Sequence, residues 1–416
     1  MSRDSVEVYG HWQPIEQPLL IGLLTFSHTS RGGVFSFVYD QAFLKSPYRL
    51  QIDPLLTLHS GELYNDAVDK NFRVFLDSSP DRWGRILMQR RAAIEYRKGS
   101  RPSSHLTELD YLLGVHDSYR MGGIRFKKAG SPHFLDDNAE FSAPPMASLR
   151  ELEHAAIQIE QDANIESDQY YQWLKMLISP GSSLGGARPK ACVIDENNHQ
   201  WIAKFPNLND SGDVGAWEMV CYELALAAGV EMFTSEIRKL STHHHTFITK
   251  RFDRIGDKRL HFSSAMTQLQ YYDGEQSHGA SYLEIVEFLV NQGAKTKADL
   301  AQLWRRIVFN IAVSNTDDHL RNHGFILTNK GWKLSPAYDI NPSVGKKGLH
   351  LNITDTENAL DYQLAFAVID FFRLTQAEAT QIYDEVLSSV KQWQKVAQRL
   401  GLSRTEQLIK QEAFNV

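Results

Sequence analysis

Short hydrophobic runs separated by polar and turn residues fill the first part of the chain, a pattern typical of β-strands. Three such runs, 6–10, 18–27 and 34–40, are rich in β-branched and aromatic residues and are separated by turn residues. The segment 79–99 predicts a helix instead, because it opens with Ser-Pro and closes on glycine. The N-terminal region is therefore expected to mix strands with helices.

The segments that follow continue this mixture. We expect a short helix over 107–117 and a strand over 121–128. Residues 130–148 are rich in Pro, Ser, Gly and acidic residues, which makes them the strongest linker candidate in the chain. Two further helices are predicted over 149–162 and 169–178.

The second half begins with strands and ends with helices. A Gly/Ser-rich loop leads to a strand over 191–194 and a second strand that ends at Lys204. A helix is predicted over 216–230, and two strands over 234–240 and 245–254 have the form of a hairpin. The rest of the chain is mostly helical, so a β-rich lobe with one helix is expected to precede a helical lobe.

Composition narrows the class of protein. The 416 residues are 42% hydrophobic and 23% charged, as in ordinary soluble proteins, and the length predicts two or three packed units. The net charge of −6 argues against binding nucleic acid through overall charge. The two cysteines, Cys192 and Cys221, fit a reducing cytoplasm. Neither a signal peptide nor a run of about 18 apolar residues is present, so we expect a cytoplasmic protein with no membrane segment.

One stretch, Val308–Leu327, interrupts two apolar runs with a dense group of polar residues. Polar groups that flank a core cost free energy unless each is satisfied, so their concentration predicts a functional site. The polar residues are Asn315, Thr316, Asp317, Asp318, His319, Arg321, Asn322 and His323.

The spacing within this stretch suits phosphoryl transfer. In a kinase catalytic loop a carboxylate orients the attacking hydroxyl while a carboxamide a short loop away holds a metal ion, and Asp317 and Asn322 have that spacing. A second carboxylate, Asp339, follows a predicted strand and turn and could complete a Mg²⁺ site.

A glycine-rich segment precedes these residues. In 182–190, Gly185 and Gly186 allow backbone N–H groups to approach phosphates, and Lys204 on the following strand could pair with them. Each feature alone is weak, because short motifs arise by chance. Their order, glycine loop, lysine, helix, catalytic loop and metal carboxylate, favours a kinase, and no GxxxxGK[ST] motif supports a P-loop protein.

Seven segments along nearly the whole chain resemble the HipA-like serine/threonine kinases, the toxins of bacterial toxin–antitoxin pairs. They are "FLDSSPDRWGRILMQRR", "YRMGGIRF", "SSLGGARPKA", "WIAKFP", "KRFDR", "NTDDHLRNHGF" and "SPAYDINP". The resemblance implies an α+β fold: a two-lobed kinase-like structure with an N-terminal mixed α/β subdomain and a mostly helical C-terminal lobe. We expect the N-terminal subdomain over 1–140, the β-rich nucleotide-loop lobe over 141–252 and the helical catalytic lobe over 253–416.

The same resemblance implies ATP and Mg²⁺ as cofactors and assigns residue roles. Asp317 would be the catalytic base, and Asn322 and Asp339 would hold Mg²⁺. The residues expected to bind ATP are Gly185, Gly186, Ala187, Arg188, Pro189, Lys190, Lys204, Lys250, Arg251, Phe252, His319, Arg321, Asn322, Tyr338 and Asp339.

Regulation and a lysine partner are two further expectations. In the family a serine at the start of the glycine loop is autophosphorylated, which switches the kinase off; here that serine is Ser183, with Ser182 as the alternative. The added charge of about −1.5 to −2 would repel the triphosphate. From its place early on the predicted helix, Glu218 is a possible partner of Lys204, and Glu223 competes for that role.

The resemblance also implies partners: an aminoacyl-tRNA synthetase as substrate, a small helix-turn-helix antitoxin of HipB type, and operator DNA bound mainly through that antitoxin. Two alternatives stay open, a small-molecule kinase and a non-catalytic module that binds an antitoxin or DNA. The three histidines at 243–245 lie between two predicted strands, and we expect them at an exposed hairpin tip rather than in a metal site.

Overall fold

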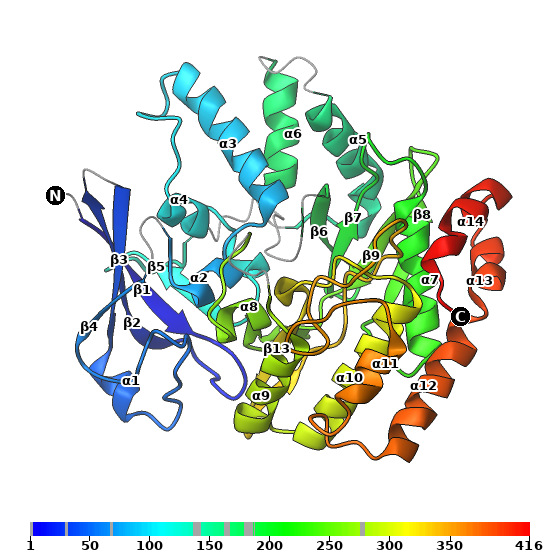
Figure 1. Cartoon of the computed structure of the whole chain (residues 1–416). Helices are drawn as coiled ribbons and strands as arrows, with labels where there is room; N and C mark the ends of the chain where they lie inside the picture. The colour runs from blue at the N-terminus through cyan, green and yellow to red at the C-terminus, as the bar shows by residue number, and fades with distance from the viewer. Residues whose placement is uncertain are drawn as a thin grey trace. The chain divides into compact units, whose positions relative to one another are not determined.

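The computed structural model describes residues 3–29, 32–66, 70–135, 143–161, 167–178, 186, 188–274 and 279–416 (Figure 1). The chain forms two compact units. The N-terminal unit comprises Met1–Leu208 and Asp253–Ser263, and the C-terminal unit comprises Asn209–Phe252 and Ser264–Val416. None of the helices in the described ranges is long and apolar enough to cross a membrane.

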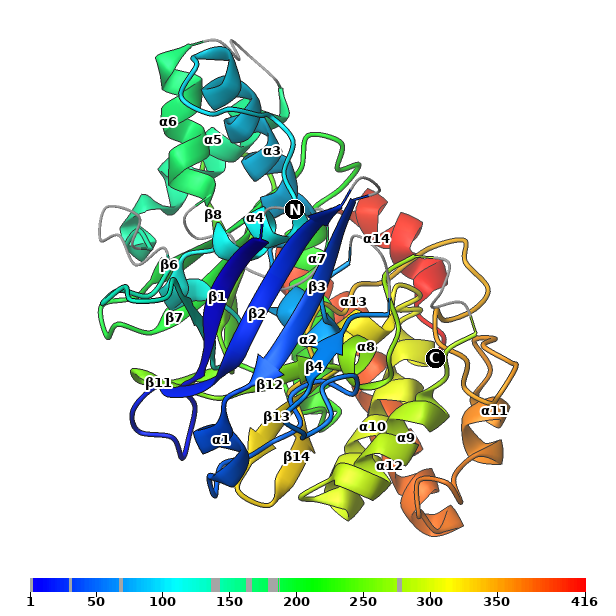
Figure 2. The same ribbon diagram turned by 90° about the vertical axis from the view of Figure 1, so that its left-hand side faces the viewer.

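A five-stranded antiparallel sheet, in the order β4-β3-β2-β1-β5, organises the N-terminal unit, and β1, β2 and β3 lie side by side in Figure 2. Its strands alternate buried and exposed residues, as Val6 and Val8 do on β1, so one face lies against the core. All three predicted N-terminal strands and the strand predicted over 121–128 are confirmed. The strands are β1 (Arg3–Gly10), β2 (Leu19–Thr29), β3 (Gly32–Tyr39), β4 (Glu62–Tyr64) and β5 (Ile124–Lys127).

Phenylalanine rings fill the core beneath this sheet. The Phe37 ring lies 5.9 Å from that of Phe75, and Phe75 meets Phe126 edge-on at 5.7 Å. All three rings are at most 1% exposed. Burying such a side chain contributes about 1.5–3 kcal/mol, so these contacts hold the short helix of Phe75 against the sheet.

Six α-helices accompany the sheet in the described part of this unit. The helix predicted from Ser79 begins three residues later, at Arg82, because the Asp81 carboxylate accepts a hydrogen bond from Gly84 N (2.9 Å) and caps the first turn. The helices predicted over 107–117 and 149–162 are confirmed in shorter form, and the helix predicted over 169–178 begins one residue earlier. The helices are α1 (Gln41–Lys45), α2 (Arg73–Asp77), α3 (Arg82–Arg97), α4 (Glu108–Leu113), α5 (Leu149–Glu160) and α6 (Asp168–Ile178).

Two small hairpins complete the unit. Strands β6 (Lys190–Ile194) and β7 (Gln200–Lys204) pair antiparallel, as predicted, around a turn in which Asn198 has a φ of 62°. Strands β10 (Arg254–Ile255) and β11 (Lys258–Arg259) pair around a second turn.

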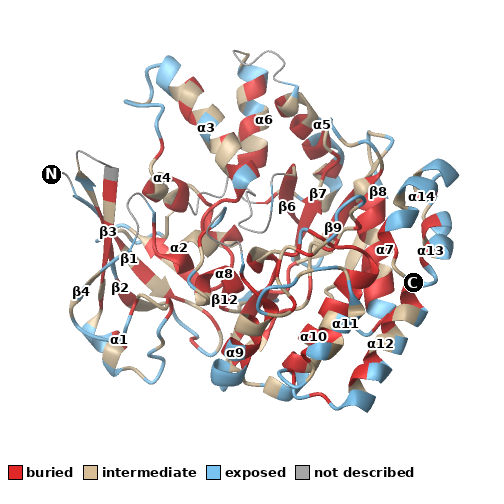
Figure 3. Ribbon diagram, viewed as in Figure 1, coloured by how far each residue is buried: buried red, intermediate tan, exposed pale blue. Residues whose placement is uncertain are grey.

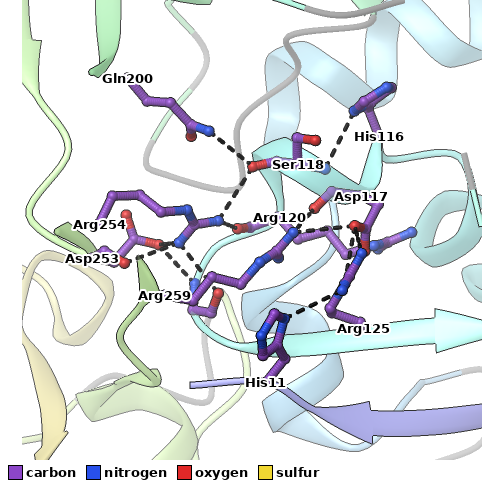
Figure 4. A network of polar contacts seen from close by, with 11 residues as sticks. His11, His116, Asp117, Ser118, Arg120, Arg125, Gln200, Asp253, Arg254 and Arg259 are labelled. Atoms are coloured by element: carbon purple, nitrogen blue, oxygen red, sulfur yellow. Dashed lines mark hydrogen bonds and ion pairs between the residues drawn. The ribbon is translucent and has the colours of Figure 1, made fainter. Parts of the chain in front are cut away.

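Buried ion pairs fasten this second hairpin to the rest of the N-terminal unit (Figure 4). Asp253 is fully buried, accepts a hydrogen bond from Gly122 N (2.8 Å) and pairs with Arg254 at 2.5 Å. The Arg254 guanidinium also donates to the carbonyl oxygens of Ser118 (3.3 Å) and Arg120 (2.6 Å). The motifs "YRMGGIRF" and "KRFDR" therefore contact each other directly, and these contacts give Asp253 and Arg254 a structural role.

A second carboxylate, Asp117, extends the same network. It lies 2.5 Å from Arg125 Nη2 and 3.1 Å from Arg259 Nη2. Burial raises the pKa of Asp117, but the two guanidinium groups outweigh burial and hold the pKa below its usual value. Asp117 is therefore charged at neutral pH and stabilises the hairpin that carries Arg259.

Helices dominate the C-terminal unit, as predicted for the end of the chain. Helix α7 (Val214–Ala227) and the antiparallel pair β8 (Ser235–Lys239) and β9 (His245–Lys250) come first. Strand β12 (Phe262–Ser264) spans the passage between the units, and β13 (Gly324–Thr328) pairs with β14 (Gly331–Leu334). The helices that follow are α8 (Ala265–Gln268), α9 (Tyr282–Gln292), α10 (Thr296–Ala312), α11 (Tyr362–Ala367), α12 (Gln376–Val390), α13 (Trp393–Arg399) and α14 (Arg404–Lys410).

Helices α9, α10 and α12 bury one side and expose the other (Figure 3). Helix α7 is the exception, because it is apolar nearly all round and its Trp217 ring packs against Trp393 (6.2 Å) and Phe414 (6.1 Å). Such a helix is expected inside a core.

His245 corrects one expectation about the three histidines. It opens β9 instead of lying at an exposed tip, and its Nδ1 lies 2.6 Å from Asp213 Oδ2. Asp213 also caps α7 by accepting from Ala216 N (3.1 Å), so this pair fastens the hairpin to the helix. His243 alone of the three is exposed.

We predict that Asp253→Asn destabilises the protein by about 3–5 kcal/mol, because it leaves the buried Arg254 guanidinium without its counter-charge. The midpoint of urea unfolding measures the change. Asp257→Asn, an exposed site in the neighbouring turn, serves as the matched control and should stay within about 0.5 kcal/mol of the parent. Equal effects of the two substitutions would contradict a structural role for the Asp253 pair.

Candidate active site

The polar stretch identified in the sequence is the loop between α10 and β13. Most of its polar side chains are buried: Asn315, Thr316, Asp318, Asn322 and His323 are each at most 4% exposed. Asp317 differs, because it is exposed to solvent. The loop therefore presents the Asp317 carboxylate to solvent, while the five buried polar side chains lie within the protein.

Two parallel contacts hold this loop, each between residues five apart. Asn322 Nδ2 donates to the Asp317 carbonyl oxygen (3.0 Å). His323 Nε2 lies 2.9 Å from Asp318 Oδ1. A single turn of 3₁₀ helix, Leu320–Asn322, lies between the paired positions.

Asn322 has the form of a cation ligand. Its amide nitrogen is fixed by the Asp317 carbonyl, so the orientation of the carboxamide is set. Its Oδ1 atom is buried and receives no hydrogen bond from the part of the chain that the structure describes. A buried oxygen of this kind matches the preference of Mg²⁺ for oxygen ligands.

The described ranges contain no group of three or more His, Cys, Asp or Glu side chains placed to hold a metal ion. A Mg²⁺ ion bound with a nucleotide does not require one, since such ions take one or two protein carboxylates together with phosphate oxygens and water. The residues present fit this simpler arrangement.

Asp339 lies in a short segment after the β13–β14 hairpin. Its φ of 59° is unusual for a residue other than glycine, and such backbone conformations are concentrated at functional sites. Neighbouring contacts bring the segment to the loop: Tyr338 Oη donates to Arg321 O (2.8 Å), and Asn341 N donates to Asn315 Oδ1 (3.3 Å).

Other predicted ATP-binding residues lie beside this segment or in the polar loop before it. The Phe252 ring stacks on Tyr338 with centroids 5.6 Å apart, which brings Lys250–Phe252 to the residue before Asp339. The Arg321 guanidinium forms an ion pair with Asp273 (3.1 Å), and the His319 ring meets His350 edge-on at 5.8 Å. The C-terminal unit thus gathers the predicted catalytic, metal and hinge residues.

The predicted glycine-loop residues belong to the N-terminal unit. Ser183, Gly185 and Ala187 lie outside the described residues, as does Ser182. Gly186 has a φ of 83°, and Arg188 and Pro189 lead into β6.

Lys190 has an unexpected environment at the start of β6. Its ammonium group and the Asp81 carboxylate, each about 1% exposed, form a buried ion pair, and the same nitrogen donates to Gly186 O (3.1 Å). The glycine loop is therefore anchored, at its end, to the N-terminus of α3. Lys190 as a nucleotide ligand remains a prediction.

Lys204 ends β7 in the N-terminal unit, and its pairing with Glu218 of α7 stays a prediction. Glu218 is buried at 4% exposure. Glu223, the competing candidate, forms an ion pair with Arg399 of α13. This contact gives Glu223 a partner within its own unit and favours Glu218 for the other role.

Sequence analysis placed Asp318 in the polar group without assigning it a role, and it did not name Asp213. The burial of each carboxylate depends on a partner distant in sequence: Asp318 contacts Tyr282, 36 residues earlier, and Asp213 contacts His245, 32 residues later.

Comparison with known proteins identifies the family. The model of the HipA-like C-terminal domain matches residues 182–394, just over half of the chain, so the chain belongs to the HipA-like family. Two curated relatives are "Putative kinase Y4mE" of Sinorhizobium fredii, 25% identical over 33% of this chain, and "Putative kinase" of Haemophilus influenzae, 26% identical over 42%. The chain spans 33% and 56% of the lengths of these relatives.

One solved structure resembles the fold along its length. It is the HipA toxin of Shewanella oneidensis MR-1 in complex with HipB and operator DNA, with a TM-score of 0.68 at 16% identity over 98% of this chain and 94% of that one. The likeness and the element order confirm the predicted α+β kinase-like fold.

We predict that Lys190→Met destabilises the protein by about 3–5 kcal/mol, because the Asp81 carboxylate stays buried without its partner. Lys98→Met is the matched control: Lys98 pairs with Asp168 on the surface, where an ion pair contributes about 0–1 kcal/mol. Urea unfolding measures both. If Lys190→Met leaves stability unchanged, Lys190 does not anchor the loop, and weaker ATP binding in the same variant would then support its role as a nucleotide ligand alone.

Proposed function

We propose that this chain is an ATP- and Mg²⁺-dependent protein serine/threonine kinase of the toxin type. The observation that carries the proposal is the orientation of Asn322 beside Asp317. One carboxamide oxygen is buried and has no hydrogen bond within the described chain, while the carboxylate five residues earlier is exposed. A phosphoryl-transfer site needs this pairing of a metal ligand with an accessible base.

The surroundings of the residues support the roles proposed for them. Asp317 accepts the proton of the substrate hydroxyl, since its carboxylate faces solvent where an acceptor can approach. Asn322 and Asp339 hold the metal ion through oxygen atoms, and Tyr338 keeps Asp339 near the loop through its bond to Arg321 O. When bound, Mg²⁺ neutralises charge on the ATP phosphates. The stack of Phe252 on Tyr338, the residue before Asp339, supports a contact between Phe252 and the adenine ring.

The remaining ATP contacts come from the N-terminal unit. Lys204 and the segment from Gly185 to Lys190 bind the phosphates, and Glu218 orients Lys204. Phosphorylation of Ser183 would add negative charge beside the triphosphate and inhibit the enzyme.

The family supports a substrate and partners for this kinase. We propose that it phosphorylates a cytoplasmic translation protein, an aminoacyl-tRNA synthetase, and binds a small helix-turn-helix antitoxin. The structural relative is described with HipB and operator DNA, and the net charge of −6 favours DNA contact mainly through the antitoxin.

Intact-mass spectrometry after incubation with ATP and Mg²⁺ tests phosphoryl transfer. We expect a gain of about 80 Da per phosphate in the parent protein and none in Asp317→Asn, because the variant lacks the base. Peptide mapping should place the phosphate on Ser183. Protein treated with phosphatase beforehand controls for phosphate acquired during expression.

Two outcomes would contradict the proposal. A parent protein that neither gains mass nor binds ATP would favour the non-catalytic binding module. Transfer to sugars or antibiotics at a rate above transfer to any protein serine would favour the small-molecule kinase.

Removal of the carboxamide tests the metal site. We expect Asn322→Ala to raise the Mg²⁺ concentration that gives half-maximal phosphoryl transfer by roughly tenfold or more, the scale seen when metal sites lose a supporting group. Asn329→Ala, at an exposed position of the β13–β14 turn, should leave the Mg²⁺ dependence unchanged. If both variants respond to Mg²⁺ like the parent, Asn322 is not a ligand.

A further inference from the structure

Adjacent aspartates in the polar loop have opposite surroundings. Asp317, the proposed base, is exposed, whereas Asp318 is 3% exposed and turns into the protein. A carboxylate in this position loses its hydration, which costs several kcal/mol unless the protein supplies partners. The proposed chemistry does not use Asp318, so its burial requires another explanation.

Three side chains supply these partners. Tyr282 Oη and Asn310 Nδ2 (2.7 Å) both donate to Asp318 Oδ2, and His323 Nε2 lies 2.9 Å from Oδ1. Burial raises the pKa of Asp318, but His323 and Tyr282 outweigh burial and hold the pKa below its usual value. The carboxylate is therefore charged and fully engaged.

Two of the three partners come from helices of the C-terminal unit. Tyr282 is the first residue of α9, and Asn310 lies near the end of α10. Asn310 Oδ1 in turn accepts a hydrogen bond from Asn315 Nδ2 (3.1 Å), and Asn315 Oδ1 accepts from Asn341 N (3.3 Å). A continuous chain of contacts thus runs from two helices through the loop to the segment of Asp339.

The contact between Asp318 and His323 is parallel to the one between Asp317 and Asn322. Both join residues five apart, and the two are offset by one position. Together they fix both ends of the turn that separates the proposed base from the proposed metal ligand. Of these two contacts, the one between Asp318 and His323 is also linked to α9 and α10, because Tyr282 and Asn310 donate to Asp318.

We propose that Asp318 is a positioning residue that sets the separation and orientation of Asp317 and Asn322. The proposal rests on the proposed kinase function. Its physical basis is the sensitivity of catalysis to geometry: displacing a catalytic group by about 1 Å can cost about 100-fold in rate. Asp318 acts through its neighbours and touches neither substrate nor nucleotide.

The test compares Asp318→Ala with Asp213→Ala. Asp213 is a matched control, because it is also a buried carboxylate in the C-terminal unit, beside a histidine (2.6 Å) and two backbone N–H donors. Phosphate incorporation from radiolabelled ATP is measured per folded molecule over a range of ATP concentrations. Both variants lose stability, but only the first alters the loop of Asp317.

We expect Asp318→Ala to lower the maximal rate by about 10- to 100-fold, with the half-saturating ATP concentration within about threefold of the parent. Asp213→Ala should keep the maximal rate of the parent. A loss confined to stability, or equal losses in the two variants, would overturn the positioning role.

Asp318→Asn supplies the conservative comparison. Its carboxamide oxygen can accept from Tyr282 and Asn310, and its Nδ2 can donate to Nε2 of a neutral His323, so both contacts across the loop survive. We expect its rate within about tenfold of the parent and well above that of Asp318→Ala. An Asn variant as slow as the Ala variant contradicts a role based on geometry.

His323→Ala covers the case in which Asp318→Ala does not fold. It removes the same contact from the other side and leaves the carboxylate to Tyr282 and Asn310. A rate about tenfold lower is expected, and a parental rate would overturn the proposal. If the parent protein itself transfers no phosphate, the kinase function fails first and the positioning role falls with it.

Discussion

A charged group that is taken out of water is stable only beside partners, and this constraint organises both units of the chain. In the N-terminal unit, Asp253 and Arg254 fasten a short hairpin to the backbone around Gly122. In the C-terminal unit, Asp318 gathers Tyr282, Asn310 and His323 around the polar loop. Each pair fixes segments that have little hydrophobic surface of their own, because a carboxylate demands donors in definite directions.

Family motifs outside the catalytic loop therefore have a structural meaning. The aspartate of "SPDRWGR" caps α3 and pairs with Lys190, so the helix start and the end of the glycine loop are held by one carboxylate. The second arginine of "KRFDR", Arg254, donates to the carbonyl oxygens of Arg120 and Gly122 in "YRMGGIRF". A protein can spread such residues widely in sequence because folding brings them together, and the N-terminal unit thus supports the loop on which nucleotide binding is proposed to depend.

In the C-terminal unit the groups proposed for catalysis differ from those that stabilise the loop. Asp317 is exposed, and Asn322 Oδ1 receives no hydrogen bond within the described ranges, so these are the groups proposed to react or to bind, while the buried polar residues around them hold the backbone. The positive φ of Asp339 fits the same division, since a strained residue persists only where its surroundings fix it. This arrangement supports kinase chemistry with positioning and charge neutralisation as its main means.

Much of the fold and part of the site could be predicted from residues that are near one another in the sequence. Runs rich in β-branched and aromatic residues predicted β1–β3, and glycine and capping residues predicted helix ends to within a few positions. The Asp-x₄-Asn spacing located the polar loop. The start of α3 was missed because a carboxylate cap at Asp81 competed with the Ser-Pro signal at Ser79 and Pro80.

The sequence by itself thus determined many of the elements, their order and the residue types proposed to hold ATP and Mg²⁺. Only the tertiary structure decided which of two adjacent aspartates faces solvent, that Lys190 pairs with Asp81 109 residues earlier, and that His245 pairs with Asp213. The physical reason is that burial and charge pairing depend on what lies across space. The hydrophobic periodicity and motif spacing of a sequence depend only on residues that are near one another along the chain.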